Sequence, residues 1–442
     1  MHEVTDTQAV LPAAAVLLHR GDKIWLGQRG KVRFLPGFSV FPGGGCHEGE
    51  TFQQAAIREL SEETGLRCHE SMLQPFSRAI TPPYSQYRFD VRVYSLELGT
   101  GREPEPDGFE LIAGHWMTPD EVLWKRRQGD IQLAPPTYRQ IKQWKNRDAT
   151  SIPSEETAFA QPPARNEKVL PMANGICVIP LPTSALPPAA WTNTVLLGER
   201  DYYLVDPGGP EQDHLREEMA RRSALGQNLR GVLLTHHHPD HIEGYHQLKA
   251  DKLPLFCHPK TAELLPSEFP KPRLLEHGNS LNIAGDLTIE AIYCPGHAPG
   301  HLAFYIPQRR TLLAGDMISS LSSIVIPADN GCLVDYLESL ERLRQINAGL
   351  VIPSHGPPFG GDSDPFGTAL IHRQKRESQV LATLSAEPTS VETITQKVYG
   401  KLDPRLVGAA QVNVNHYLKK LEREAKVFHR ENGWLLNEDA AN

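Results

Sequence analysis

The stretch "GVLLTHHHPDH", residues 231–241, decides how this chain is interpreted. It begins as a short apolar run, which predicts a buried strand, and ends with four histidines and one aspartate in seven residues. Such a cluster has no packing logic, and its imidazoles would repel one another when protonated. In an extended chain His236 and His238 point to the same side, and a turn at the proline brings Asp240 and His241 after them. We interpret His236, His238, Asp240 and His241 as metal ligands that follow a strand.

One loop cannot fill two metal sites, so further ligands should lie elsewhere in the chain. Three candidates each follow a predicted strand: His297 in "CPGHAPGH", Asp316 at the end of "TLLAGD" and His355 in "VIPSHGPP". Ligands at several strand ends meet at one rim of a sheet, where α/β folds commonly place their chemistry. Imidazole and carboxylate donors together favour Zn²⁺, with iron or manganese as alternatives. The sequence therefore predicts a centre for two zinc ions.

A second cluster of candidate ligands lies in "GGGCHEGETFQQAAIRELSEETGL", residues 43–66. Thr51 begins a capping box, so a helix is predicted to start there, and Gly65 suits its C-terminal cap. The glycine run before the helix would let backbone approach a ligand closely. We therefore expect Gly43 and Gly44 to contribute to substrate binding.

Three carboxylates of this helix, Glu59, Glu62 and Glu63, are spaced three and four residues apart and hence share one face. They would repel one another, so the face costs stability unless a cation lies on it. Hard oxygen ligands suit Mg²⁺ or Mn²⁺, which keep several waters and bind substrate phosphates. Arg58 is expected to pair with a neighbouring glutamate and to orient it.

The same stretch resembles the Nudix box, and the likeness to Nudix hydrolases covers about residues 10–147. The nine matching positions are Gly44, Glu50, Arg58, Glu59, Leu60, Glu62, Glu63, Gly65 and Leu66. The resemblance implies an α/β/α sandwich that cleaves a diphosphate linked to another moiety. It implies that the three glutamates of the helix hold the metal, that Arg58 orients one of them, and that one carboxylate acts as base. Glu110 is the candidate for a later metal-binding glutamate. The preceding "FLPGFSVFPGGG" is similar to the corresponding segment of Nudix enzymes that act on coenzyme A derivatives.

The histidine-rich set resembles the ligand set of the metallo-β-lactamase superfamily over about residues 170–365, and "YLVDPGG" with Asp206 matches its early aspartate motif. The resemblance implies an αββα sandwich in which two metals share a hydroxide that attacks a carbonyl or phosphorus. It assigns one metal to His236, His238 and His297, and the other to Asp240, His241 and His355, with Asp316 between them. Asp240 is also expected to take part in catalysis. His301 is expected either to contact substrate or to pack in the interior, and His237, His258 and Cys294 are expected not to be ligands.

Length and composition indicate an α/β multidomain protein. A chain of 442 residues is too long to fold around a single hydrophobic core, so two or three domains are expected. We predict a Nudix domain at 1–147, a polar, proline-containing linker at 148–169, a metallo-β-lactamase-fold domain at 170–370 and a winged-helix-like tail at 371–442.

Charge and cysteine content limit the partners and the compartment. The net charge of −8 argues against binding of nucleic acid through overall charge, and the tail has 11 Lys and Arg against 9 Asp and Glu. The six cysteines are scattered, which favours reduced thiols in a cytoplasmic protein. We expect no signal peptide and no membrane partner, because no apolar stretch approaches about 20 residues.

These patterns favour a bifunctional metal-dependent hydrolase with two independent sites. The Nudix site would cleave a nucleoside- or coenzyme-A-type diphosphate. The zinc site would hydrolyse either a thioester, as glyoxalase II does, or an RNA phosphodiester, which would suit the tail; the acidic chain slightly favours the small thioester. A non-enzymatic nucleotide sensor with a DNA-binding tail is the other alternative, which the two complete ligand sets disfavour.

Overall fold

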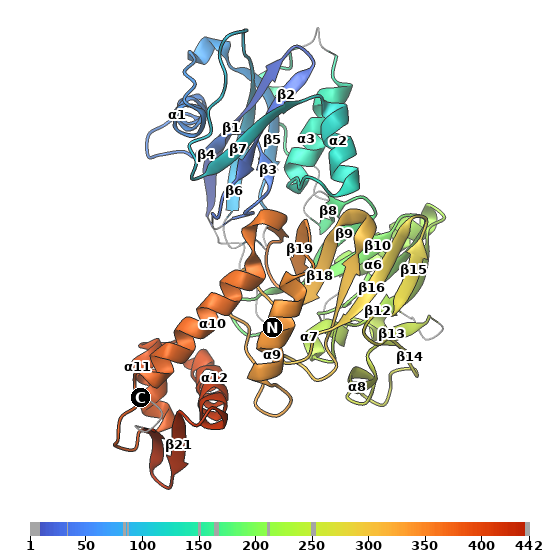
Figure 1. The fold of residues 1–442 in the computed structure, drawn as a ribbon. Coiled ribbons are helices and arrows are strands. Elements are labelled where there is room, and N and C mark those ends of the chain that lie inside the picture. Colours follow the sequence, from blue (N-terminus) through green and yellow to red (C-terminus); the bar gives the residue numbers. More distant parts are fainter. Residues whose placement is uncertain are drawn as a thin grey trace. The chain divides into compact units, whose positions relative to one another are not determined.

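The computed structural model describes residues 9–32, 34–82, 85, 88–148, 152–162, 168–209, 213–248 and 253–437 (Figure 1). The chain forms two compact units. The first comprises Met1–Pro180, Gln308–Thr311 and Pro357–Ser363, and the second comprises Leu181–Pro307, Leu312–Gly356 and Asp364–Asn442. None of the helices in these described ranges is long and apolar enough to span a bilayer.

The first unit is built on one mixed sheet. Its strands are β1 (Val10–Arg20), β2 (Lys23–Arg29), β3 (Ser39–Val40), β4 (Gly43–Gly45), β5 (Gln74–Ile80), β6 (Arg88–Glu97) and β7 (Leu111–Met117). They lie in the order β3-β2-β1-β6-β5, with β4 paired to β1 and β7 paired to β2. The predicted strands at the N-terminus are thus present, and β1 and β6 run parallel along their lengths.

Helices cover both faces of this sheet, namely α1 (Phe52–Thr64) on one side and α2 (Pro119–Gln128) with α3 (Pro135–Asn146) on the other (Figure 1). The alternation of side chains along β1 explains the two layers. Ala14, Val16 and Leu18 pack in the core with α1, whereas Leu17 packs in a second core with Val122 and other residues of α2 and α3. This is the expected α/β/α sandwich.

The helix α1 begins and ends where its capping residues predict. The Thr51 hydroxyl accepts the Gln54 N–H at 3.2 Å, and the Thr51 N–H donates to the Gln54 side chain at 3.0 Å. At the other end Gly65 adopts the left-handed conformation with φ 68°, which favours glycine because no Cβ is present.

The segment between the two expected catalytic domains is more than the polar linker that we predicted at 148–169. Within it α4 (Glu155–Ala158) is capped by Ser154, and Ala158 and Phe159 are buried in the core beneath α1. The Phe159 ring meets Tyr94 edge to face at 5.4 Å. A four-residue helix has too little periodicity to be recognised in a polar sequence, and its two buried side chains anchor the segment to the first unit.

Two sheets form the core around the histidine-rich loops. The first has the order β14-β13-β12-β11-β10-β9-β8 and the second β15-β16-β17-β18-β19-β20. The strands of the first are β8 (Leu170–Ala173), β9 (Ile176–Pro182), β10 (Trp191–Gly198), β11 (Asp201–Val205), β12 (Asn228–Leu233), β13 (Leu255–Cys257) and β14 (Arg273–Leu274). Those of the second are β15 (Ser280–Ala284), β16 (Leu287–Tyr293), β17 (Leu302–Ile306), β18 (Thr311–Gly315), β19 (Leu350–Pro353) and β20 (Phe359–Gly360).

The helices of this part of the chain are α6 (Asp213–Ala224), α7 (Pro239–Ile242), α8 (Pro259–Ala262) and α9 (Leu333–Arg344). The strands β11, β12, β13 and β14 run parallel, so their carboxyl ends lie at one edge of the sheet. The expected ligand loops follow β12, β16, β18 and β19.

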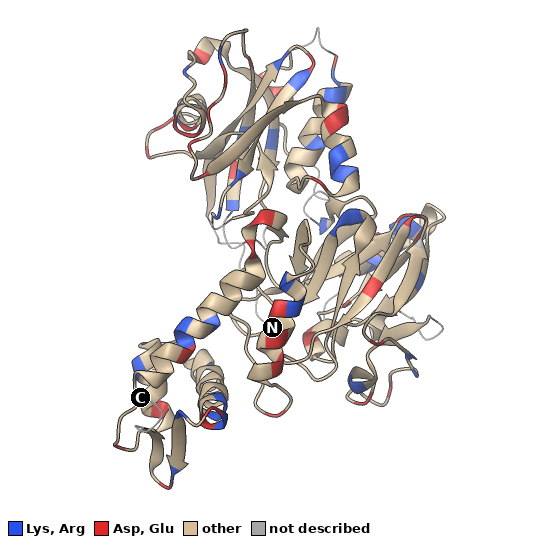
Figure 2. Ribbon diagram, in the orientation of Figure 1, with Lys and Arg blue, Asp and Glu red and all other residues tan. Residues whose placement is uncertain are grey.

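The tail consists of α10 (Pro365–Leu381), α11 (Val391–Tyr399), α12 (Pro404–Arg423) and the hairpin of β21 (Val427–Arg430) and β22 (Gly433–Leu436). This is the predicted order of helices and hairpin, although α10 begins six residues before the expected boundary at residue 371. Figure 2 shows basic and acidic residues on both α10 and α12, and the sequence gives these two helices seven Lys and Arg against two Asp and Glu. The tail as a whole has 11 Lys and Arg against 9 Asp and Glu, which is a small positive excess for a nucleic-acid-binding domain.

Candidate metal centres

Four loops at strand ends bring all seven expected ligands of the histidine-rich set together. They form three overlapping groups whose ligand atoms lie within 4.8 Å of one another. These groups are His236, His238 and His297; His236, His241 and Asp316; and Asp240, His241 and His355. Asp316 thus lies in the group that joins the other two, which is the place that the resemblance implied for it.

Three ring nitrogens crowd together in the first group. The Nδ1 atom of His238 lies 2.9 Å from Nε2 of His236 and 2.9 Å from Nε2 of His297. A neutral imidazole carries one N–H, so His238 can donate to only one of these lone pairs. A cation between the three nitrogens would satisfy all of them at once.

Carboxylates and imidazoles alternate in the rest of the centre. Asp316 Oδ1 lies 3.6 Å from His241 Nε2 and 3.5 Å from His355 Nε2, and its Oδ2 lies 3.6 Å from His297 Nε2. Asp240 Oδ2 lies 3.2 Å from His355 Nε2. The Nε2 atom of His241 and the Oδ1 atom of Asp316 are buried without a hydrogen-bond partner. Such orphaned atoms are costly, and a metal ion would take up both.

Electrostatics also favour neutral ligands and a bound cation. Burial and the neighbouring His297 lower the pKa of His238 to about 3, and burial together with His241 holds the pKa of His236 well below its ordinary value. Both rings are therefore neutral and free to coordinate. At His355, burial is outweighed by Asp316 and Asp240, which raise its pKa to about 10. The carboxylates of the centre thus stabilise positive charge.

Partners outside the cluster orient the ligand rings. The Nδ1 atoms of His297 and His355 lie 2.9 Å from the Val325 carbonyl and 3.0 Å from the Trp191 carbonyl, respectively. A carbonyl can only accept, so Nδ1 carries a proton in each ring and Nε2 is the nitrogen that faces the other ligands. In His355 a metal would take the place of the second proton, which Asp316 and Asp240 favour on this ring.

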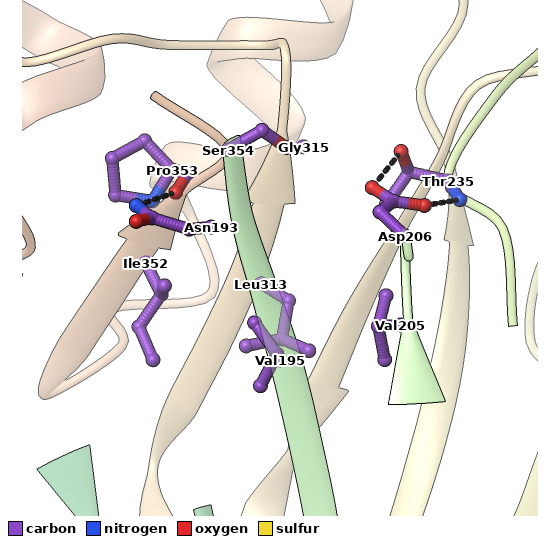
Figure 3. Close-up of a pocket in the computed structure, with 10 residues that line it drawn as sticks. All are labelled: Asn193, Val195, Val205, Asp206, Thr235, Leu313, Gly315, Ile352, Pro353 and Ser354. Atoms are coloured by element: carbon purple, nitrogen blue, oxygen red, sulfur yellow. Dashed lines mark hydrogen bonds between the residues drawn. The ribbon is translucent and has the colours of Figure 1, made fainter. Parts of the chain in front are cut away.

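Asp206 is the hub of a second set of orienting bonds. It is 2% exposed and accepts the Thr235 N–H at 2.7 Å, the Thr235 hydroxyl at 2.6 Å and His241 Nδ1–H at 3.0 Å. The Thr235 oxygen in turn accepts His236 Nδ1–H at 3.0 Å. Figure 3 shows the two bonds between Asp206 and Thr235. The sequence motif marked Asp206, but only the fold shows that this residue orients His241 directly and His236 through Thr235.

Figure 3 also shows a small pocket between the strands beside Asp206. Its lining residues are Asn193, Val195, Val205, Asp206, Thr235, Leu313, Gly315, Ile352, Pro353 and Ser354. Its cavity volume of about 10 Å³ leaves room for about one water molecule and lies far below the ~300 Å³ of ordinary ligand sites. None of the seven candidate ligands lines it, so it is a small void rather than a substrate site.

His301 packs in the interior, which is one of the two roles expected for it, and the other role, contact with substrate, is contradicted by its burial. Its side chain is fully buried, its Nε2 accepts the Asp316 N–H at 3.1 Å, and its Nδ1 lies 3.2 Å from Cys294 Sγ. The ring also stacks on His236 with centroids 5.0 Å apart. Position along the chain cannot reveal burial of this kind, because three separate loops create it.

The expected non-ligands are not members of the three ligand groups; they are His237, His258 and Cys294. His258 stacks on the Tyr293 ring with centroids 4.4 Å apart. Burial raises the pKa of the Cys294 thiol, so this sulfur stays protonated. His237 lies beside His238 with ring centroids 4.8 Å apart.

In the first unit Arg58 is the centre of the acidic cluster. Its guanidinium donates to Glu59 at 2.8 Å and to Glu62 at 2.9 Å, and it pairs with both oxygens of Glu50 at 2.9 and 3.0 Å. It also donates to the Gly45 carbonyl at 2.8 Å. One arginine therefore orients three glutamates, whereas the sequence suggested a single partner.

The three glutamates of α1 differ in environment. The side chain of Glu62 is 58% exposed and that of Glu59 13% exposed. Glu63 is buried, its Oε1 has no hydrogen-bond partner, and burial raises its pKa to about 8. Arg29 and Glu110 act electrostatically on Glu63, so the later candidate glutamate lies near the cluster. A buried carboxylate with an orphaned oxygen fits a divalent cation.

The glycine run serves the protein rather than a ligand, at least at Gly43. The Gly43 N–H donates to Glu63 Oε2 at 2.7 Å. We had expected Gly43 to contribute to substrate binding, but its N–H group is already engaged within the protein. A Cβ at Gly43 would lie 2.3 Å from the Ala14 oxygen, and one at Gly44 would lie 2.4 Å from a Glu59 carboxylate oxygen. Glycine is therefore required at Gly43, where a Cβ would meet the backbone of β1, whereas at Gly44 a Cβ would displace only the Glu59 carboxylate.

Comparison with known families agrees with this organisation. The model of the NUDIX domain matches residues 10–139, that of the metallo-beta-lactamase superfamily residues 192–355, and that of the beta-lactamase associated winged helix domain residues 390–434. The predicted fusion of three modules is thereby confirmed.

Individual relatives match the second of these modules. The chain is 31% identical over 170 residues to the Bacillus subtilis protein named "Probable metallo-hydrolase YybB", covering 35% of this chain and 76% of that protein. It is 25% identical over 256 residues to a Pseudocercospora fijiensis protein named "Atrochrysone carboxyl ACP thioesterase", covering 55% of this chain and 73% of that protein. A solved beta-lactamase domain protein from Burkholderia ambifaria has a TM-score of 0.53 and 21% identity, and the match covers 65% of this chain and 96% of that one.

The match to the structure from Burkholderia ambifaria supports the fold of the second module. The family models and the relative from Bacillus subtilis settle its membership and its general chemistry. The chain is a hydrolase of the metallo-β-lactamase superfamily that also carries a Nudix domain and a β-lactamase-associated winged-helix domain.

Proposed function

We propose that the chain is a bifunctional metal-dependent hydrolase. Its histidine-rich centre hydrolyses a thioester with the help of two zinc ions, and its Nudix site cleaves a diphosphate linked to a nucleoside or coenzyme A group with magnesium or manganese. The observation that carries the proposal is the convergence of seven imidazole and carboxylate ligands, two of whose buried ligand atoms have no hydrogen-bond partner.

Zinc ions held by this set would lower the pKa of water to about 7 and polarise a carbonyl group. The protein contributes orientation, since the Val325 and Trp191 carbonyls accept the Nδ1 protons of His297 and His355 and so turn the Nε2 atom of each ring toward the other ligands. Asp240 is the candidate among these ligands to hydrogen-bond and orient the attacking water, because its side chain is 14% exposed and its Oδ2 lies 3.2 Å from His355 Nε2.

A thioester is favoured over RNA by two observations. One relative of the second module is named as an acyl-carrier-protein thioesterase, and its name speaks for a carbonyl electrophile on a sulfur leaving group. The tail as a whole has 11 Lys and Arg against 9 Asp and Glu, and the whole chain has a net charge of −8. Neither feature assists binding of a polyanion.

At the Nudix site a divalent cation on Glu59, Glu62 and Glu63 would neutralise the charge of the diphosphate. Arg58 holds Glu59 and Glu62 in one arrangement through bonds of 2.8 and 2.9 Å. Glu63 is the candidate base toward water, because burial raises its pKa to about 8 in the metal-free protein; once a bound cation has displaced its proton, this carboxylate would be more basic than an ordinary one.

The test is a screen of the purified full chain against acyl-coenzyme A and acyl-carrier-protein thioesters, ADP-ribose, coenzyme A and single-stranded RNA, with metal content measured on the same batch. We expect turnover of a thioester and of a diphosphate. RNA cleavage without thioester hydrolysis would show that the zinc site acts on RNA and not on a thioester. The proposal would be refuted if the purified protein contained no transition metal, or if it turned over none of these substrates.

Two variants test whether the sites are independent. Glu62→Gln is expected to lose diphosphate cleavage and keep thioester hydrolysis, and Asp240→Ala is expected to do the reverse. Each variant is the control for the other, and loss of both activities in either one would contradict independent sites.

A further inference from the structure

The ring of His297 depends on a segment that belongs to neither sheet. Its Nδ1–H donates to the Val325 carbonyl at 2.9 Å, and Val325 lies in the irregular segment 319–331 between β18 and α9. A segment without regular secondary structure does not hold its own carbonyls in place. The position of the Val325 carbonyl must therefore be set by whatever the segment packs against.

The tail supplies those contacts on both sides of Val325. On the near side Arg373 of α10 donates to the Ile324 carbonyl, and the His372 ring lies 3.2 Å from the Ser323 hydroxyl. On the far side His416 of α12 donates to the Pro327 carbonyl at 3.0 Å.

A fourth, longer contact comes from the Asn413 side chain, which lies 3.5 Å from the Ile326 N–H. The four tail residues thus contact the four neighbours of Val325 in the segment 323–327. The Val325 carbonyl is left to accept from His297.

Arg373 is the most deeply placed of these four residues. It is 4% exposed, its guanidinium lies 5.0 Å from the centroid of the Tyr336 ring, and the Tyr336 hydroxyl donates to the Met317 carbonyl at 2.8 Å. Burial of a guanidinium costs several kcal/mol unless its donors are satisfied. The Arg373 guanidinium thus contacts the segment of Val325 directly, and through the Tyr336 ring it is linked to Met317, the residue after Asp316.

We propose that the winged-helix tail is a positioning element of the metal centre. By fixing segment 323–327, α10 and α12 hold the Val325 carbonyl against His297 and so set the affinity of the site formed by His236, His238 and His297. The inference rests on the proposed metal centre but not on its substrate. It also provides a route for regulation, since any molecule that displaces α10 or α12 from the segment would weaken metal binding.

The physical effect is on the tautomer and orientation of one ligand. Without a fixed acceptor at Nδ1, the His297 ring can rotate and can carry its proton on Nε2, which blocks coordination. Loss of an outer partner of a ligating histidine typically costs 10–100-fold in metal affinity. The effect should be confined to one of the two ions, because His355 and His241 have their own partners, the Trp191 carbonyl and Asp206.

The experiment compares three variants of the full chain. Arg373→Met and His416→Ala remove contacts to the segment, and His416 is only half-buried, so its loss should be tolerated by the fold. Arg376→Met is the matched control, because Arg376 lies one turn along the same helix but donates to the Val398 carbonyl at 2.9 Å and lies 4.2 Å from the Tyr399 ring, both within the tail.

Zinc affinity is measured by competition with a chromophoric chelator, and Co²⁺-substituted protein is examined by absorption spectroscopy. We expect one of two zinc equivalents to bind 10–100-fold more weakly in Arg373→Met and His416→Ala, with an altered spectrum for one Co²⁺, and no change in Arg376→Met. Wild-type affinity in a folded His416→Ala variant would overturn the proposal, as would an equal loss in Arg376→Met. Because no substrate is involved, failure of the proposed thioesterase activity would leave this result unaffected.

Discussion

Replacing Asp206 with asparagine tests the orienting network most directly, because the change removes a charge and keeps the shape. Asp206 accepts three hydrogen bonds, one at Oδ1 from the Thr235 N–H and two at Oδ2 from the Thr235 hydroxyl and His241 Nδ1–H. Asparagine has one acceptor oxygen. If that oxygen takes the place of Oδ2, the amide N–H₂ faces the Thr235 N–H, and two donors then oppose each other.

The magnitude follows from these contacts. A hydrogen bond to a charged group is worth about 1.5–3 kcal/mol and an unsatisfied buried donor costs about 1–3 kcal/mol, so we expect the free energy of unfolding to fall by about 2–4 kcal/mol. Metal affinity should fall 10–100-fold, because Asp206 orients His241 directly and His236 through Thr235. In free energy this is about 1.4–2.7 kcal/mol.

The assays are denaturant unfolding and zinc competition with a chelator. The matched control is Asp201→Asn, which makes the same chemical change at the start of β11, the strand that ends just before Asp206. Asp201 is a surface residue paired with Arg230 at 2.8 Å, so this change should alter neither quantity. If Asp206→Asn bound both zinc equivalents with wild-type affinity, the argument that this carboxylate sets the two histidine tautomers would be refuted.

Three further outcomes are expected. Treatment with a chelator should abolish thioester hydrolysis, Zn²⁺ should restore it, and recovery with Mg²⁺ alone would contradict the assignment of the two ions. Asn193→Ala should lower the free energy of unfolding by about 1–3 kcal/mol and weaken zinc binding. The Asn193 side chain donates to the carbonyls of Pro353 and Gly356 at 2.9 and 2.8 Å and so fixes the loop that carries His355; unfolding of the variant at the wild-type denaturant concentration would refute this. Glu63→Gln should stabilise the metal-free protein above about pH 5, and the gain should grow toward pH 8. Burial raises the pKa of Glu63 to about 8 in the folded protein, so the wild type loses stability as the pH rises above the pKa that this carboxyl has in the unfolded chain. Thermal melts across this pH range check the sign, and the variant should also lose diphosphate cleavage.

Local patterns in the sequence determined much of the fold and the composition of the site. The capping box at Thr51 predicted the start of α1, and the apolar runs before His236, Asp316 and His355 predicted strands that are present as β12, β18 and β19. These features depend on neighbours within a few residues, so the chain order contains them. The ligand types were likewise predictable, because the chemistry of imidazole and carboxylate does not depend on the fold.

Tertiary structure alone decided the relations between distant residues. It placed His301 in the interior against Asp316 rather than facing a substrate, and it gave Gly43 to Glu63 rather than to a ligand. It also brought Arg373 to the segment that orients His297, since Arg373 contacts Ile324 across 49 positions in the chain. Such contacts arise from the packing of whole helices and sheets, and spacing within the sequence carries no information about which backbone carbonyl a buried side chain will meet.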